Sequence, residues 1–183
     1  MPTTIAPRVE IFLDDSNFYN GLQQQFGEGR YDIVKLAQRI VGARTLSRMN
    51  FYTGLVDPGR QAQAAQKQQS FLYSLSKLPI PVQVFARPMK YYAAWPAVPP
   101  QEKGVDARIV QDLIIGAVDN TYDVAVLLSG DQDFIEVVQL LHSRFSVCLE
   151  TYYPAARRHL YEAARPCFAH AQVITKEFYD SIR

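Results

Sequence analysis

The segment YDVAVLLSGDQDF, residues 122–134, decides the fold of this chain. An apolar run over 124–129 predicts a buried strand, and a Ser-Gly turn follows it. Asp131 and Asp133 come directly after that turn, where a helical pattern over 134–142 begins. The segment therefore predicts a strand, a turn that carries two carboxylates, and a helix.

The same alternation of short apolar runs and longer helical patterns extends in both directions. Further strands are predicted over 9–13, 48–54, 82–86 and 146–150, and further helices over 31–41, 60–77 and 106–119. Strands that alternate with helices indicate β-α-β units. We therefore predict an α/β fold with a mainly parallel sheet of about five strands.

Length and composition place the chain among ordinary globular proteins. Its 183 residues are 48% hydrophobic and fit one domain, with a core over about 8–150 and a C-terminal extension, 151–183, packed on that core. The 19 Lys and Arg against 18 Asp and Glu exclude strong binding of polyanions over the whole surface. The start of the chain resembles no signal peptide and no apolar run is long enough to span a membrane, so we expect a cytoplasmic protein without membrane contact.

Two acidic pairs follow predicted strands. Asp14 and Asp15 close the first strand, and Asp131 and Asp133 follow the fourth. A lone Asp at such a junction is often only a helix N-cap, but one helix needs only one cap. Because ligands of parallel sheets bind at the carboxyl ends of the strands, these carboxylates are candidates for a site. Close carboxylates repel one another unless a cation neutralises them, and Mg²⁺ or Mn²⁺ suits oxygen ligands.

A third acidic position lies on the predicted helix over 106–119. Asp106 falls on the apolar stripe of that helix, four residues before Val110. A carboxylate on a core-facing stripe is costly without a partner, which favours a role in the site. Asp112 points away from the stripe, and helical geometry alone favours a solvated surface acid there.

Three ordered motifs carry a family resemblance over about residues 8–150. IFLDDSNFYN at 11–20, KGVD at 103–106 and the segment quoted first together resemble the NYN domain of the LabA-like group, a branch of the PIN-like nuclease superfamily. The resemblance implies a three-layer α/β/α fold. It also implies an acidic pocket that binds Mg²⁺ or Mn²⁺ and cleaves RNA phosphodiester bonds.

The resemblance assigns roles to residues that match the motifs. The carboxylates implied to hold one or two metal ions and to carry catalysis are Asp14, Asp106, Asp131 and Asp133. Residues implied to orient ligands or phosphate around them are Asn17, Ser129, Lys103 and Asp112. Asp15 departs from the pattern, because the family commonly has Gly there; its carboxylate either joins the metal site or turns outward as a cap.

A Pro-rich loop over 87–103 precedes the KGVD motif. It carries the cations and rings Arg87, Lys90, Tyr91, Tyr92 and Trp95. Aromatic rings between cations suit single-stranded nucleic acid, whose bases stack on them. The alternative is that the rings pack on the domain or form a homodimer contact. A second basic stretch, Arg157 and Arg158, either touches the phosphate backbone or forms a solvated helix face.

Rival interpretations explain less of the sequence. A response-regulator receiver also has an acidic pair after strand one, but the chain is too long and the SGDQD segment has no role there. A haloacid-dehalogenase phosphatase needs an aspartate two residues after Asp14, where Ser16 stands. The alternative to a metal-dependent ribonuclease that stays open is a non-cleaving RNA-binding or regulatory module with the same acidic pocket.

Overall fold

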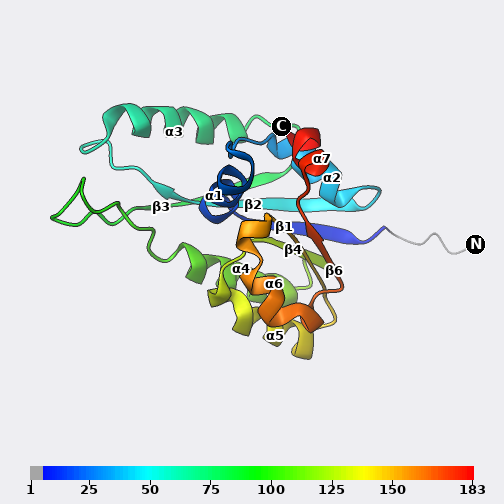
Figure 1. The fold of residues 1–183 in the computed structure, drawn as a ribbon. Helices are drawn as coiled ribbons and strands as arrows, with labels where there is room; N and C mark the ends of the chain where they lie inside the picture. Colours follow the sequence, from blue (N-terminus) through cyan, green and yellow to red (C-terminus); the bar gives the residue numbers. More distant parts are fainter. Residues whose placement is uncertain (1–5) are drawn as a thin grey trace, which may run out of the picture.

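The computed structural model describes residues 6–183, and in these residues six strands form one sheet flanked by seven α-helices (Figure 1). The strands are β1 (Arg8–Asp14), β2 (Thr45–Leu55), β3 (Val82–Pro88), β4 (Val124–Leu128), β5 (Cys148–Tyr153) and β6 (His170–Val173). The helices are α1 (Asp15–Phe26), α2 (Ile33–Val41), α3 (Ala62–Leu75), α4 (Val105–Val118), α5 (Ile135–Arg144), α6 (His159–Ala164) and α7 (Lys176–Ile182). Short 3-10 turns are η1 (Gln132–Phe134), η2 (Ala155–Arg157) and η3 (Arg165–Cys167).

The sheet is parallel throughout, in the order β3-β2-β1-β4-β5-β6. The predicted α/β fold with a parallel sheet is confirmed, with one strand more than the approximate five. The additional strand β6 is four residues long and only partly buried, so its apolar pattern is weak. It lies in the C-terminal extension and pairs with β5 at the edge of the sheet.

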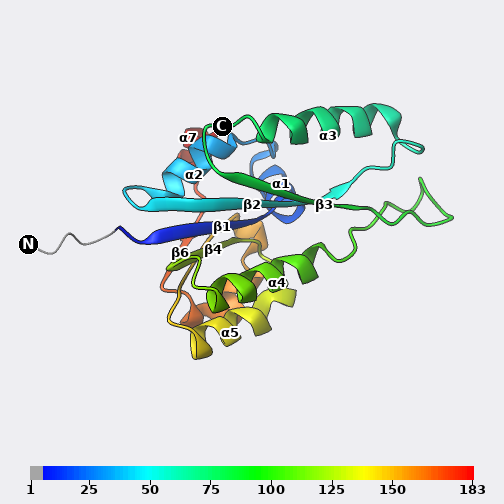
Figure 2. The ribbon, with the colours of Figure 1, turned by 180° about the vertical axis from the view of Figure 1, so that it is seen from behind.

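Helices cover both faces of the sheet and complete three layers. Figures 1 and 2 show α1, α2, α3 and α7 on one face and α4, α5 and α6 on the other. Each face of the sheet carries a hydrophobic core, and successive residues of β1 contribute to them in turn. Ile11 and Leu13 pack in the core on one face, and Phe12 packs in the core on the other. Side chains alternate between the faces of a strand, so Asp14 lies on the same face as Phe12.

Helix α1 is missing from the pattern of apolar residues in the sequence. Its segment is mostly polar and buries only Phe18, Gly21 and Leu22. The termini of α1 carry clear signals instead: Asp14 is its N-cap, and Gly27 ends it with a φ of 79°, a conformation that favours glycine.

The strand order creates a crevice at the carboxyl ends of β1 and β4. After β1 the chain continues into α1 on one face, and after β4 it continues through η1 into α5 on the other. Neighbouring strands whose connections leave to opposite faces mark the point where parallel sheets bind ligands. The two predicted acidic pairs lie there.

Two further observations concern membrane-spanning helices and cysteine thiols. Among residues 6–183 we find no helix of the length and apolarity that crossing a membrane requires. Cys148 and Cys167 are both partly buried free thiols.

Candidate nuclease site

Asp14 joins the ends of β1, α1 and β4. As the N-cap of α1 it accepts a hydrogen bond from the backbone N–H of Asn17, with an N to Oδ1 distance of 3.2 Å. The hydroxyl of Ser129 donates to its other oxygen at 2.9 Å. The Asp14 side chain is therefore fixed, and only 4% of the residue is exposed.

The Ser-Gly turn after β4 is held by the same group of side chains. The backbone N–H of Gly130 donates to Asn17 Oδ1 at 3.0 Å, and that of Asp131 donates to Ser129 Oγ at 3.2 Å. Asp131 in turn caps η1 by accepting from the N–H of Asp133 at 3.0 Å. Asn17 and Ser129 thus position the turn that presents both aspartates.

Asp106 reaches the same crevice from the first turn of α4. This helix begins after Gly104, whose φ of 75° lets the loop turn into the helix without a side chain. Desolvation raises the pKa of the Asp106 carboxyl, and the negative charges of Asp131 and Asp133 raise it further. Aspartates from α4 and from the turn after β4 therefore lie within electrostatic range of each other.

The buried Asp14 carboxyl is the most perturbed member of this group. Burial is the largest cause and raises its pKa to about 7, while the hydrogen bonds from Ser129 and Asn17 partly oppose the shift. The charges of Asp106 and Glu102 add to the increase. The structure thus brings together four predicted aspartates, which we call the acidic cluster: Asp14, Asp106, Asp131 and Asp133.

Glu102 belongs beside the acidic cluster, although the sequence did not mark it. Its Oε1 accepts from Ser16 Oγ at 2.6 Å and from the backbone N–H of Gly54 at 2.7 Å, which links α1, β2 and the loop before α4. The only signal in the sequence is its place one residue before the KGVD motif. A glutamate in a Pro-rich loop is not distinctive, so this signal was too weak.

Asp15 turns away from Asp14. Its Oδ1 accepts a hydrogen bond from the hydroxyl of Tyr31 at 2.6 Å, on the α1 and α2 side of the sheet. Burial raises the pKa of its carboxyl to about 6, and Glu102 contributes to the increase. Asp14, not Asp15, caps the helix, and Asp15 in the first turn of α1 is bound to Tyr31 instead of Ser129.

Asp112 lies about two turns beyond Asp106 on α4, and Lys103 lies in the loop before this helix. Asp112 is farther along α4, where Arg108 Nε contacts it at 2.8 Å and the hydroxyl of Tyr52 donates to it at 2.9 Å. These partners hold it at the flank of the helix. Lys103 is exposed in the loop immediately before α4.

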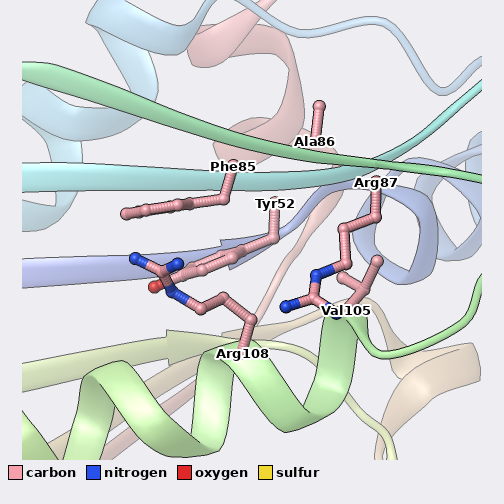
Figure 3. A pocket seen from close by; sticks show the side chains of 6 residues that line it. All are labelled: Tyr52, Phe85, Ala86, Arg87, Val105 and Arg108. Carbon is pink, nitrogen blue, oxygen red and sulfur yellow. The ribbon is translucent and has the colours of Figure 1, made fainter.

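A small cavity of about 80 Å³ lies between β3 and the start of α4 (Figure 3). Phe85 stacks on Tyr52 with ring centroids 5.1 Å apart, and the Arg108 guanidinium lies 3.9 Å from the Phe85 centroid. In Figure 3 the Arg87 side chain runs from β3 toward Val105. Arg87 thus places an exposed cation beside the helix terminus that carries Asp106.

The loop between β3 and α4 projects beyond the carboxyl edge of the sheet in both views (Figures 1 and 2). Its two arms pair through Lys90 and Gln101, and Tyr92 donates to the Gln101 side chain at 2.8 Å. Tyr91 and Trp95 make an edge-to-face contact, and Arg60 lies over both rings. These two rings pack on the connection between β2 and α3 and keep part of their surface exposed.

The basic stretch after β5 divides into two kinds of residue. Arg158 is exposed and pairs with Glu162 one helical turn later, at 2.7 Å. Arg157 packs against α1 and the Ser-Gly turn, because Cβ atoms added at Gly21 or Gly130 would overlap it. Within the described residues, its buried Nε has no hydrogen-bond partner. The N–H of Leu160 donates to the Gly130 carbonyl at 3.2 Å, so this segment supports the turn.

The acidic cluster suits a hard divalent cation by its chemistry. All its donors are carboxylate oxygens; burial is the largest cause of the raised pKa of Asp14 and Asp106, and repulsion by neighbouring carboxylates adds to it. Within residues 6–183, no three His, Cys, Asp or Glu side chains stand close enough together to ligate one ion as they lie. The chemistry of the donor set fits Mg²⁺ or Mn²⁺.

Comparisons with known proteins agree with this architecture. A crystal structure of a protein of unknown function from Vibrio parahaemolyticus RIMD 2210633 is similar in fold, with a TM-score of 0.71 and 20% identity over 97% of this chain and 99% of that chain. Among curated proteins none matches. The sequence pattern of the NYN domain matches residues 8–168, which include every member of the acidic cluster. The chain therefore belongs to the NYN domain family, a branch of the PIN-like nuclease superfamily.

Proposed function

We propose that this NYN domain is a metal-dependent ribonuclease that hydrolyses RNA phosphodiester bonds at the acidic cluster. The observation that carries the proposal is the convergence of Asp14, Asp106 and Asp131 from three separate elements at one crevice. Placing several carboxylates close together costs free energy, and such arrangements are typical of functional sites rather than of stabilising contacts.

The residues around the cluster have separate tasks in this mechanism. Asp14, Asp106, Asp131 and Asp133 would hold Mg²⁺ or Mn²⁺, which when bound lowers the pKa of water and offsets charge on the phosphate. Ser129 and Asn17 fix the carboxylate of Asp14 and the turn with Asp131. Glu102 adds negative charge on the β2 side.

Cations and rings near the crevice favour a single-stranded substrate. Arg87 and Lys103 flank the start of α4 and are positioned to contact phosphates. The projecting loop adds Lys90, Tyr92 and the partly exposed ring of Trp95. A base stacked on such a ring contributes about 1–3 kcal/mol. Arg157 contacts the RNA backbone beside the Ser-Gly turn. Tyr91 holds the projecting loop in place. A cytoplasmic location and a homodimer stay predictions from the sequence.

The decisive experiment incubates labelled single-stranded RNA with the purified protein in Mn²⁺ or in EDTA. We expect cleavage only with Mn²⁺, and loss of cleavage in Asp131→Asn and Asp133→Asn. Asp119→Asn is the matched control, because Asp119 is exposed at the opposite end of α4 from Asp106. Full activity in Asp131→Asn contradicts the proposal, and RNA binding without cleavage supports the regulatory module instead.

The projecting loop is tested separately with Trp95→Ala. Loss of its stacking surface should weaken binding of single-stranded RNA several-fold. Unchanged RNA affinity would mean that the ring only packs on Tyr91 and Arg60. The measurement is fluorescence anisotropy with labelled RNA, and gel filtration of the same variant reports whether a dimer depends on the ring.

A further inference from the structure

A second, mostly apolar pocket opens on the other side of Asp14. It has a volume of about 390 Å³ and is lined by Asp15, Tyr19, Arg30, Tyr31 and Phe71. These residues come from α1, the segment between α1 and α2, and α3. Volumes of about 300–1,000 Å³ with a few polar groups are typical of small-ligand sites.

The aromatic walls of this pocket remain open to solvent. Tyr19 is 36% exposed and Phe71 is 44% exposed. Phe71 is supported by an edge-to-face contact with Phe51, and Tyr31 by one with Phe18, each with centroids less than 6 Å apart. The rings are therefore held in place from behind and present free surface to the pocket.

Two polar groups define what the pocket accepts. Asp15 uses Oδ1 to accept from the Tyr31 hydroxyl, and Oδ2 has no hydrogen-bond donor among the described residues. Arg30 is exposed, and within residues 6–183 its guanidinium pairs with no carboxylate. A carboxylate with a free oxygen selects a ligand edge that carries N–H donors, while Arg30 suits a phosphate or an aromatic plane.

The pocket adjoins the acidic cluster. Asp15 follows Asp14 directly in the chain, and the two side chains leave on opposite faces of the sheet edge. The charge of Glu102 acts on both carboxyls, so Glu102 lies near both sites. The pocket therefore lies next to the proposed phosphate site, through the adjacent residues Asp14 and Asp15.

We propose that this pocket binds one unpaired nucleobase of the substrate strand, and that Asp15 selects guanine by accepting from its Watson–Crick edge. Guanine offers two adjacent N–H donors to a carboxylate, whereas the single N–H of uracil lies between two carbonyl oxygens that repel it. Stacking of splayed bases on aromatic rings, with hydrogen bonds to their edges, is how proteins read single-stranded RNA. The inference rests on the proposed function only for the identity of the ligand as part of a nucleic acid.

The test measures binding of GMP and UMP in EDTA, so that the acidic cluster contributes no metal. We expect GMP to bind about tenfold more tightly than UMP. Asp15→Asn should abolish this preference while keeping an oxygen for the Tyr31 hydroxyl. Phe71→Ala should weaken binding of both nucleotides about tenfold. Tyr73→Ala is the matched control, because Tyr73 is on the same helix, 66% exposed and outside the pocket.

Thermal unfolding of each variant checks that the fold is intact. Equal affinity for GMP and UMP, no binding of either, or an effect of Tyr73→Ala equal to that of Phe71→Ala overturns the proposal. Mapping of cleavage products in Mn²⁺ separates the two proposals. RNA cleavage without any effect of Asp15→Asn or Phe71→Ala overturns the base pocket alone, whereas selective GMP binding without RNA cleavage overturns the nuclease alone.

Discussion

The hydroxyl of Ser129 donates a hydrogen bond to the carboxylate of Asp14 at 2.9 Å, and this bond joins the ends of β1 and β4. The two residues are 115 positions apart in the chain. After them the chain leaves to opposite faces of the sheet, so the bond closes the crevice at its base. The chemistry proposed for this domain depends on how this contact sets the charge of Asp14.

Asp14 should make the stability of the metal-free protein depend on pH. Its pKa is about 7 in the folded protein against 3.8 in the unfolded chain, so the folded state holds the extra proton between these values. The free energy of unfolding should therefore fall as pH rises from about 4 to 7, by up to about 4 kcal/mol. Asp14→Asn should remove this part of the slope, as measured by urea unfolding across that pH range in EDTA. An unchanged slope in the variant would contradict the raised pKa of the buried Asp14 carboxyl.

Ser129→Ala should weaken metal binding near neutral pH. The Ser129 hydrogen bond lowers the pKa of Asp14, so its loss raises that pKa above about 7 and leaves more of the carboxyl protonated. We expect the Mn²⁺ affinity at pH 7 to fall about tenfold and to recover at pH 8.5. Calorimetric titration at the two pH values checks this, and a loss independent of pH would mean that Ser129 acts only by holding the turn.

Glu102→Gln separates charge from hydrogen bonding. The glutamine carbonyl still accepts from Ser16 Oγ and from the N–H of Gly54, so thermal stability should stay within about 1 kcal/mol of the wild type. The lost charge should reduce Mn²⁺ affinity by about tenfold. Equal metal affinity in the variant and the wild type would exclude Glu102 from the electrostatics of the cluster.

Gly130→Ala should damage the turn that carries Asp131. A Cβ at position 130 would overlap the backbone carbonyl of Arg157, which is not a flexible side-chain end and must move as a segment. We expect a loss of about 1–3 kcal/mol in the free energy of unfolding and a larger proportional loss of nuclease activity. Gly59→Ala is a suitable control, because a Cβ there meets only the Asp57 side chain at 3.2 Å.

The sequence predicted the elements whose pattern is strong. Examples are β4, with its continuous apolar run, and α2 and α4, each with a stripe of apolar residues. Burial on one or both faces of an element requires apolar residues at regular positions in the sequence. Helix α1 was not predicted, because its helical conformation depends on the cap at Asp14 and on the packing of only a few residues. The strand β6 was not predicted, because an edge strand needs little apolar surface.

The site shows the same division. Asp14, Asp131 and Asp133 were predicted to lie together because they follow strands whose positions the parallel sheet dictates, whereas Asp106 was predicted from its place on the helix stripe and in the KGVD motif. Glu102 and the pocket at Asp15 depend on a loop and on α3, whose placement against β2 has no periodic signature. The hydrogen bond from Tyr31 determines the direction of the Asp15 side chain. The two residues are 16 positions apart, and their contact is visible only in three dimensions.

Because residues 157–160 support the Ser-Gly turn, they also determine when the site is completed during synthesis of the chain. During synthesis Asp14, Asp106 and Asp131 leave the ribosome before residues 157–160, whose contacts with Gly130 and Gly21 hold the turn. A nascent chain that stops before these residues therefore lacks a finished crevice. If the domain cleaves RNA, its activity is acquired only after residues 157–160 have been made and have packed against the turn, later than all four aspartates of the acidic cluster.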